Sequence, residues 1–307
     1  MRIFLTGSRG MVGRNVLEHP RATEHEWLSP SRNELDLCDF SAVRAYLDQH
    51  RPDYVIHAAG RVGGIQANIQ YPVDFLIENL DMGRNVVLAA KEVGIPRLIN
   101  LGSSCMYPRE GENPLSEKQI LTGELEPTNE GYALAKIAVA RLCQYINQQY
   151  QGFAYKTLIP CNLYGRHDKF DPAASHLVPA VIQKIHDACL SQQDSVEIWG
   201  DGQARREFMY AGDLADCIFD ALDRFDRLPD VANVGLGYDY SINEYYQTVA
   251  EMIGFKGEFW HNLDRPVGMR RKLVDTHLLK EWGWQAKTSL AEGIEKTYQF
   301  YLEQIKK

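Results

Sequence analysis

The chain has few of the features that mark a membrane protein, a secreted protein or a nucleic-acid-binding protein. Its 307 residues contain no apolar stretch near the ~18 residues of a membrane span, and no basic and apolar signal regions precede the first expected strand. The net charge is −8, whereas nucleic-acid binding calls for a clustered basic excess. These absences predict a cytoplasmic protein without a membrane or nucleic-acid partner.

Cysteine is scarce, and the six cysteines are widely separated. No two of them have the C-x-x-C spacing typical of zinc sites and redox motifs, which argues against a disulfide framework and a structural metal. We therefore expect free thiols in a reducing compartment and no bound metal. The cysteines are Cys38, Cys105, Cys143, Cys161, Cys189 and Cys217.

Strand patterns and helix patterns alternate through the first half of the chain. This alternation predicts an α/β fold with a doubly wound parallel sheet of the Rossmann type, which binds ligands at the carboxyl ends of its strands. The expected strands are Ile3–Thr6, 26–28, 53–60, Arg97–Leu101 and Tyr155–Pro160, and the expected helices between them include 39–49, 72–94 and 132–150.

Beyond Gly165 the expected elements become shorter, and the chain is long enough for two domains. We expect residues 1–165 plus about 207–237 to form a dinucleotide-binding domain, with strand Ala232–Val234 rejoining the large sheet. Residues 166–206 plus 238–307 are expected to form a smaller mixed α/β domain that binds the substrate.

Two of the expected helices carry more apolar surface than one contact with a sheet can cover. They are the helices over 72–94 and 132–150, in which apolar residues exceed a single stripe. We therefore expect a homodimer formed through these two helices.

A glycine-rich loop follows the first strand. Gly7, Gly10 and Gly13 have the spacing G-x-x-G-x-x-G, and apolar residues recur at helical spacing after them. Glycines permit a tight turn and a close approach of the backbone to a pyrophosphate, whose charge then lies at the helix N-terminus. The loop predicts a dinucleotide-binding site.

The end of the second strand indicates which dinucleotide is bound. No acid stands at its tip, where an Asp or Glu would bind the ribose hydroxyls of NAD. Arg9 and Arg32 can instead accommodate the 2′-phosphate of NADP, although Glu34 and Asp36 are close enough to keep NAD open. We expect NADP(H).

Tyr132 and Lys136 are four residues apart in an expected helix, so they share one face. An ammonium beside a phenol favours the phenolate, and we expect Lys136 to lower the pKa of Tyr132 from its usual value of about 10. Such a tyrosine can exchange a proton with a carbonyl oxygen. The same spacing also occurs by chance on solvated helices. The pair therefore indicates a catalytic site only together with the glycine loop.

Five further motifs accompany the glycine loop and the Tyr132–Lys136 pair. They are Val62-Gly-Gly-Ile65, Gly102-Ser-Ser-Cys105, Glu126-Pro-Thr-Asn-Glu130, Asn162-Leu-Tyr-Gly165 and Ser175-His176. Together these motifs resemble the extended short-chain dehydrogenase/reductases that act on nucleotide sugars, and in particular the GDP-L-fucose synthase family, nearly end to end.

The resemblance implies an activity and an assembly. Members of this family are NADPH-dependent homodimers that epimerise GDP-4-keto-6-deoxy-D-mannose at C3 and C5 and then reduce the C4 ketone to give GDP-L-fucose. Two positions depart from the family pattern. Ser8 stands where histidine is frequent, and Lys184 stands where arginine is usual, which leaves room for a related GDP-4-keto sugar.

The resemblance also implies a role for each catalytic residue. Inverting a carbon beside a ketone requires a base on one ring face and an acid on the other, and Cys105 and His176 are the matching pair, with reference pKa values of about 8.5 and 6.5. We assign Cys105 as the base and His176 as the acid, and the reverse assignment stays open. Ser103 is expected to hydrogen-bond the C4 oxygen, Tyr132 to protonate it, and Lys136 to hold the nicotinamide ribose.

The other predicted site residues bind the GDP moiety or the cofactor. Arg206 is the first candidate for the phosphates, Lys184, Arg271 and Lys272 are further candidates, and Trp199 is expected beside the nucleotide. The cofactor site is expected to comprise Gly7, Ser8, Arg9, Gly10, Met11, Val12, Gly13, Arg32, Asp36, Leu37, Ala58, Ala59, Tyr132, Lys136 and Asn162.

Four other functions are compatible with parts of this pattern. A GDP-L-colitose synthase or a GDP-heptose epimerase/reductase would share every motif named above. A nucleotide-sugar epimerase that retains NAD is disfavoured by Arg9 and Arg32. A non-catalytic dinucleotide sensor is disfavoured by the intact set of Ser103, Tyr132 and Lys136.

Overall fold

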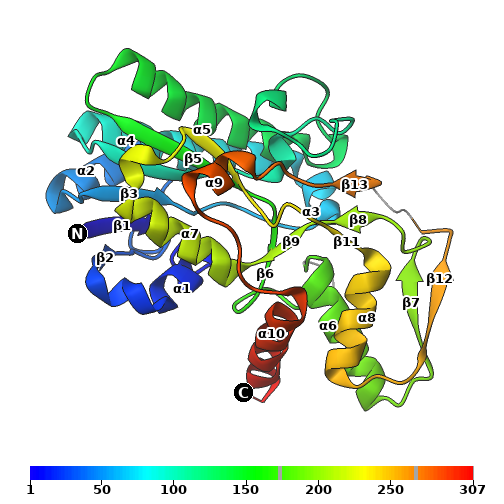
Figure 1. Ribbon diagram of the computed structural model, residues 1–307. Coiled ribbons are helices and arrows are strands. Elements are labelled where there is room, and N and C mark those ends of the chain that lie inside the picture. Colours follow the sequence, from blue (N-terminus) through cyan, green and yellow to red (C-terminus); the bar gives the residue numbers. More distant parts are fainter. Residues whose placement is uncertain (172–174, 266–268, 307) are drawn as a thin grey trace.

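A six-stranded parallel sheet lies at the centre of the computed structural model, which describes residues 1–171, 175–265 and 269–306 (Figure 1). The strand order is β10-β5-β4-β3-β1-β2, and every neighbouring pair is parallel. The predicted doubly wound fold is confirmed, and β10 joins the large sheet as expected, where it pairs with β5. The strands are β1 (Arg2–Thr6), β2 (Glu26–Leu28), β3 (Tyr54–His57), β4 (Arg97–Leu101), β5 (Ala154–Pro160) and β10 (Val231–Val234).

Alternate residues of the central strands face opposite sides of the sheet. Ile3 and Leu5 of β1 belong to the hydrophobic core on one side, and Phe4 between them belongs to the core on the other. The strands β3 and β4 repeat this alternation. Because both faces are buried, the strands are almost continuously apolar, as parallel strands between two helical layers usually are.

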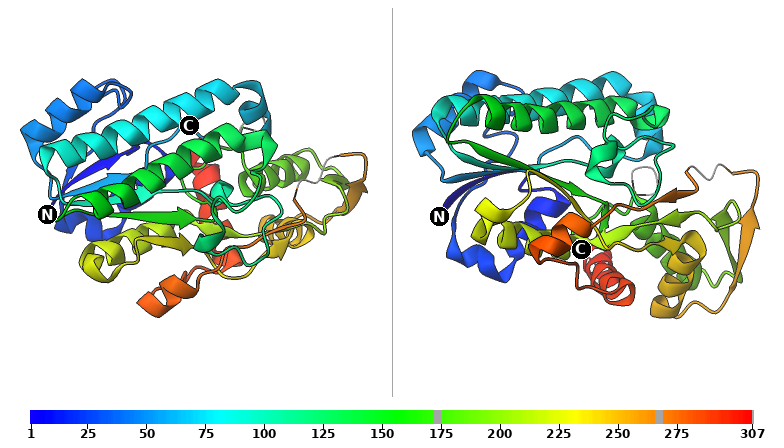
Figure 2. Two further views of the ribbon diagram at one scale, coloured as in Figure 1. Left: turned by 90° about the horizontal axis from the view of Figure 1, so that it is seen from above. Right: turned by 45° about the horizontal axis from the view of Figure 1, so that its top comes forward.

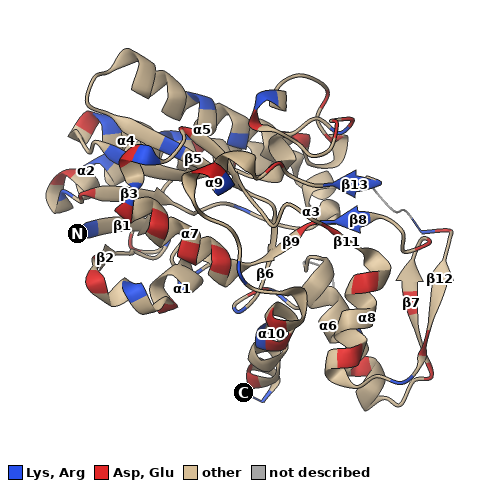
Figure 3. Ribbon diagram, in the orientation of Figure 1, with Lys and Arg blue, Asp and Glu red and all other residues tan. Residues whose placement is uncertain are grey.

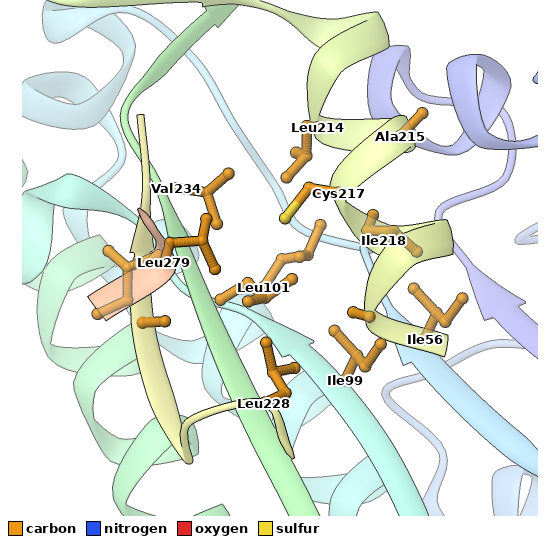
Figure 4. Packing of buried hydrophobic residues seen from close by; sticks show 14 of the residues in the cluster. Ile56, Ile99, Leu101, Leu214, Ala215, Cys217, Ile218, Leu228, Val234 and Leu279 are labelled. Atoms are coloured by element: carbon orange, nitrogen blue, oxygen red, sulfur yellow. The ribbon is translucent and has the colours of Figure 1, made fainter. Parts of the chain in front are cut away.

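Two layers of helices cover the sheet (Figure 2). The helices on one face are α2 (Phe40–His50), α4 (Pro72–Val93) and α5 (Glu130–Gln149), and those on the other are α1 (Met11–Glu18) and α7 (Ala211–Asp223). Figure 4 shows this second face, where Leu214 and Ile218 of α7 lie with Ile56 and Ile99 of the sheet in one core.

The close packing of α4 on α5 depends on a glycine. A Cβ placed on Gly83 would lie 2.4 Å from Cγ2 of Val139, which is closer than non-bonded carbons approach. On their outer side the same two helices leave Val73, Ile77 and Tyr145 exposed. These are the two helices expected to form a dimer interface.

The remaining elements pack mainly around a separate hydrophobic core. Ser241 and Glu244 form a capping box at the start of α8, and Ser289 caps α10. The main elements here are β6 (Asn162–Tyr164), α6 (Leu177–Leu190), β7 (Ser195–Trp199), β8 (Arg205–Arg206), β9 (Phe208–Tyr210), β11 (Tyr240–Ser241), α8 (Ile242–Ile253), β12 (Glu258–Asn262), β13 (Arg271–Lys272) and α10 (Leu290–Ile305). The proposed division into two domains stays a prediction.

Short helices connect the larger elements. They are η1 (Pro20–Glu24), α3 (Ile65–Gln70), η2 (Ser104–Met106), η3 (Glu117–Gln119), η4 (Pro127–Asn129), η5 (Phe225–Arg227) and α9 (His277–Trp282). Among the helices that the structure describes, none combines the length and the apolar character needed to cross a membrane.

Candidate active site

The turn after β1 lies directly against the end of β3. Gly7 has a φ of +71°, and a Cβ there would lie 2.8 Å from the Ala58 carbonyl carbon and from Cα of Ala59. A Cβ on Gly13 would lie 2.3 Å from the Gly7 carbonyl oxygen. Because β1 lies between β2 and β3, the winding of the chain reverses here, which is where doubly wound sheets bind dinucleotides.

The helix α1 begins immediately after this turn. Its N-cap is Gly10, which has no side chain to cap the first N–H groups of the helix, so these groups are available to a phosphate. Met11 and Val12 are the first two helical residues. The Thr6 hydroxyl oxygen accepts hydrogen bonds of 3.1 Å from the N–H groups of Ala58 and Ala59, which ties the ends of β1 and β3 together.

The two arginines expected at the 2′-phosphate lie on adjoining segments. The Ser8 hydroxyl donates a hydrogen bond of 3.2 Å to the Ser29 carbonyl oxygen, so the glycine loop is joined to the segment after β2. Arg9 and Arg32, which belong to these two segments, are both exposed. Their positions are compatible with the predicted contact with a phosphate.

Glu34 and Asp36, the acids that could bind the ribose hydroxyls of NAD, form hydrogen bonds within local turns. A carboxylate oxygen of Glu34 accepts a hydrogen bond of 2.7 Å from the Ser31 N–H group, and one of Asp36 accepts a bond of 3.0 Å from the Cys38 N–H group. The Leu37 carbonyl oxygen accepts from a side-chain amide of α4. These turns occupy one oxygen of each acid.

The structure brings Ser103, Tyr132 and Lys136 together beyond the end of β4. Ser103 lies two residues after Leu101, the last residue of β4, and its side chain hydrogen-bonds that of Tyr132. Lys136, one turn further along α5, is buried, and its Nζ donates a hydrogen bond of 2.9 Å to the Leu101 carbonyl oxygen. The two hydroxyl groups can therefore contact a single carbonyl oxygen of a ligand.

The expectation that Lys136 lowers the pKa of Tyr132 is wrong. Burial raises the pKa of Tyr132 above its usual value, the Cys105 thiol adds to the rise, and the hydrogen bond with Ser103 only opposes it. The Lys136 ammonium lies 5.8 Å from the centre of the Tyr132 ring and donates to Leu101 instead. Tyr132 is thus a neutral phenol near neutral pH, which is the form that can donate a proton.

Burial lowers the pKa of Lys136, whereas it raises that of Tyr132. It lowers the pKa of Lys136 from 10.5 to about 8, and the neighbouring Cys105 opposes this effect. The ammonium is retained at neutral pH and is lost in mildly alkaline solution.

Cys105 is half-buried in η2, and two donors face its sulfur. Nδ2 of Asn129 lies 3.3 Å from Sγ, and Nζ of Lys272 lies 3.8 Å from it. The Cys105 N–H group donates to the Ser103 hydroxyl oxygen at 3.3 Å. The sequence interpretation missed both donors to the sulfur. Asn129 was noticed only as part of a motif, and Lys272 was expected only at the phosphates.

His176 is the N-cap residue of α6, and its side chain is exposed. The surrounding protein nevertheless desolvates the imidazole and lowers its pKa, and the charge of Lys169 acts in the same direction. A Cβ on Gly64 would lie 3.9 Å from the carbonyl oxygen of Ser175, and α3, which follows Gly64, packs against η4. Since η4 includes Asn129, these contacts bring His176 toward Cys105, and its role as the acid stays a prediction.

The basic residues expected at the phosphates all contact neighbouring groups. Arg206 is half-buried, which lowers its pKa, and it donates a hydrogen bond of 2.8 Å to the preceding carbonyl oxygen. Arg206 belongs to β8, and Figure 3 shows basic residues on both β8 and the neighbouring strand β13. Arg271 on β13 donates at 2.5 Å to the buried carboxylate of Asp239. Lys184 donates at 2.5 Å to the Glu197 carbonyl oxygen.

Trp199 and Asn162 are the remaining residues predicted to contact a ligand. Trp199 is 51% exposed, its indole N–H donates to Glu197 at 3.1 Å, and the Arg265 guanidinium lies 5.1 Å from the centre of its ring. The Asn162 side-chain amide donates at 3.1 Å to the Glu207 carbonyl oxygen. The ligand contacts of both residues stay predictions.

Comparison with known proteins identifies the family. Residues 3–235 match the family described as the NAD dependent epimerase/dehydratase family. The chain is 55% identical over 304 residues to the GDP-L-colitose synthase of Yersinia pseudotuberculosis, covering 99% of each chain. It is 50% identical over 301 residues to the GDP-L-fucose synthase of Azorhizobium caulinodans, covering 98% of this chain and 96% of the other.

A solved structure agrees with these relatives. The GDP-mannoheptose C4 reductase of Campylobacter jejuni with NADP bound matches with a TM-score of 0.89 and 32% identity, covering 98% of each chain. The predicted resemblance and enzyme class are confirmed, and the chain belongs to the NAD dependent epimerase/dehydratase family, as an enzyme of the GDP-L-fucose synthase type.

Proposed function

We propose that the protein is an NADPH-dependent epimerase/reductase of a GDP-4-keto sugar, with GDP-4-keto-6-deoxy-D-mannose as the first candidate substrate and GDP-L-fucose as its product. The observation that carries the proposal is the position of Cys105. Reduction of a ketone requires only Ser103, Tyr132 and Lys136. The thiol, which lies close enough to raise the pKa of Tyr132, adds a base for breaking a C–H bond beside the ketone.

The first step is epimerisation. The C4 oxygen accepts hydrogen bonds from Ser103 and Tyr132, which stabilises negative charge on that oxygen. The Cys105 thiolate takes a proton from C3 or C5, an S–H bond forms, and the C–H electron pair moves into an enolate at C4. His176 then returns a proton to the opposite face of the same carbon, which inverts it.

The second step is reduction. When NADPH is bound, it supplies a hydride to C4. The electron pair of the C=O bond moves to the oxygen, which takes the proton of the Tyr132 phenol. The raised pKa of Tyr132 suits this role, because the phenol keeps its proton until the oxygen becomes basic. The Lys136 ammonium keeps its predicted role of holding the nicotinamide ribose during this step.

The residues around the glycine loop fit a dinucleotide. The close backbone contacts that glycine permits at Gly7 and Gly13 lie beside the N-terminus of α1, whose N–H groups can hold the pyrophosphate. NADPH is favoured over NADH because Arg9 and Arg32 are exposed, whereas Glu34 and Asp36 each have an oxygen engaged by a backbone N–H group.

A GDP-L-colitose synthase is the second candidate, and the 55% identity to such an enzyme favours it. Its substrate would be a related GDP-4-keto sugar with a different substitution at C3. Incubating the protein with each ketone and NADPH, followed by NMR of the products, decides between them through the ratio of kcat/KM values. If neither ketone is consumed, the proposal is wrong.

We also propose a cytoplasmic homodimer. The exposed apolar residues Val73, Ile77 and Tyr145 lie on α4 and α5, which supports an interface through these helices. All six cysteines are free thiols, which supports a reducing compartment.

A further inference from the structure

Lys272 lies beside Cys105 although 167 residues separate them in the chain. Both residues are half-buried, and Nζ of Lys272 lies 3.8 Å from Sγ of Cys105. Two of the three arginine residues on β8 and β13, Arg205 and Arg271, share the carboxylate of Asp239, and Arg206 donates to the Arg205 carbonyl oxygen. Among the described residues Lys272 has no such carboxylate partner, so its charge is available to the sulfur.

The backbone on either side of Lys272 is fixed. β13 pairs with β8, and Lys272 lies opposite Arg206. The next N–H group, that of Leu273, donates to Asn113 at 2.8 Å, and the N–H group of Val274 donates to the buried Glu207 carboxylate at 2.9 Å. These bonds hold the start of the lysine side chain, so its contact with Cys105 follows from the fold.

We propose that Lys272 is a positioning residue that holds Cys105 in its thiolate form. A thiolate, not a thiol, accepts a proton from carbon, so the ammonium raises the fraction of enzyme that is ready to react. In the step itself the C–H bond breaks, the S–H bond forms and the electron pair passes into the enolate. This role rests on the proposed function, because it assigns Cys105 as the base.

The other groups around the sulfur do not replace Lys272. Tyr132 is a neutral phenol, and Asn129 is a neutral donor at 3.3 Å. Lys136 interacts with Cys105 by charge, but its ammonium is hydrogen-bonded to the Leu101 carbonyl oxygen. Lys272 is therefore the cation in hydrogen-bonding contact with the thiol within the described part of the chain.

The test measures the thiolate without any substrate. The full-length protein is alkylated with iodoacetamide over a range of pH, and mass spectrometry of the Cys105 peptide gives the rate at this cysteine alone. Lys272→Gln removes the charge, Lys272→Arg keeps it, and Lys256→Gln removes an exposed lysine elsewhere as a control for net charge. Thermal unfolding verifies that each variant is folded.

Lys272→Gln is expected to slow alkylation of Cys105 about fivefold near pH 7, the equivalent of about 1 kcal/mol for a partly exposed ion pair. Lys272→Arg and Lys256→Gln should stay within about twofold of the wild type. Equal alkylation rates in the wild type and Lys272→Gln would overturn the inference, and a raised KM for the substrate would then assign Lys272 to the phosphates. Because no sugar is present, this outcome is distinct from a failure to turn over either ketone.

Discussion

The rate of the reduction step should fall in mildly alkaline solution, because Lys136 loses its proton there. Its pKa is lowered to about 8, so the ammonium predicted to hold the nicotinamide ribose is lost as the pH rises through this value. Roughly nine tenths of the enzyme carries the charge at pH 7 and roughly one tenth at pH 9, so the reduction rate should fall about tenfold between them.

The same titration of Lys136 should raise the free energy of unfolding above about pH 8, where the reduction rate falls. Between pH 8 and 10.5 the unfolded chain binds a proton at residue 136 that the folded protein has lost, so this group's contribution to the free energy of unfolding rises with pH. The shift from 10.5 to about 8 corresponds to roughly 3 kcal/mol, and Lys136 is only 7% exposed, so little of this is screened. Lys136→Met should lack this rise.

The assay follows the loss of NADPH absorbance with the ketone at saturation, and deuterium incorporation at C3 or C5 is measured in parallel at each pH. Lys136→Arg keeps a charge at all these pH values and should flatten the profile of the reduction step. A wild-type reduction rate that stays constant from pH 7 to 9, in protein that remains folded, would refute the reasoning about Lys136.

Three further outcomes are expected. Gly83→Ala should lower the free energy of unfolding by about 1–3 kcal/mol through contact with Val139, and adding Val139→Ala should recover part of the loss; a neutral or stabilising effect in denaturant titrations would contradict the packing of α4 on α5. Arg32→Ala should weaken NADPH binding by about 1.5–3 kcal/mol and leave NADH binding almost unchanged, and equal losses for both cofactors would mean that Arg32 does not bind the 2′-phosphate. Tyr145→Glu should yield monomers in sedimentation experiments, and a wild type that is already monomeric at micromolar concentration would rule out the proposed interface.

The sequence predicts the elements of the large sheet well because their signals are local. The strand Arg97–Leu101 has the predicted bounds, and the helix α4 ends one residue before the end of the expected range of 72–94. Asp39, at which the expected helix 39–49 begins, is the N-cap of α2, and such a signal is local because a capping residue and its helix are adjacent in the chain. The glycine loop was recognisable for the same reason.

The finer features of the site depend on contacts between distant segments. The pairing of β13 with β8 sets the positions of Arg271 and Lys272, and no periodicity reports the register of two-residue strands. The direction of the Tyr132 pKa depends on how deeply the phenol is buried and on where the Lys136 ammonium is directed. The spacing of Tyr132 and Lys136 gave their shared face but neither of these facts.

The most direct test of the account is whether epimerisation and reduction at this one site depend on different residues. The wild type, Cys105→Ser and Tyr132→Phe are each incubated with GDP-4-keto-6-deoxy-D-mannose and NADPH in heavy water, and NMR follows both deuterium at C3 and C5 and the state of C4. Tyr132→Phe should lose reduction by about 10²–10⁴ and still incorporate deuterium, more slowly because the enolate is less stabilised. Cys105→Ser should incorporate none, because a serine hydroxyl is a far weaker acid than a thiol and supplies no comparable base, while reduction of the unepimerised ketone can persist. Deuterium incorporation at the wild-type rate in Cys105→Ser would contradict the account, because Cys105 would then be only a packed thiol.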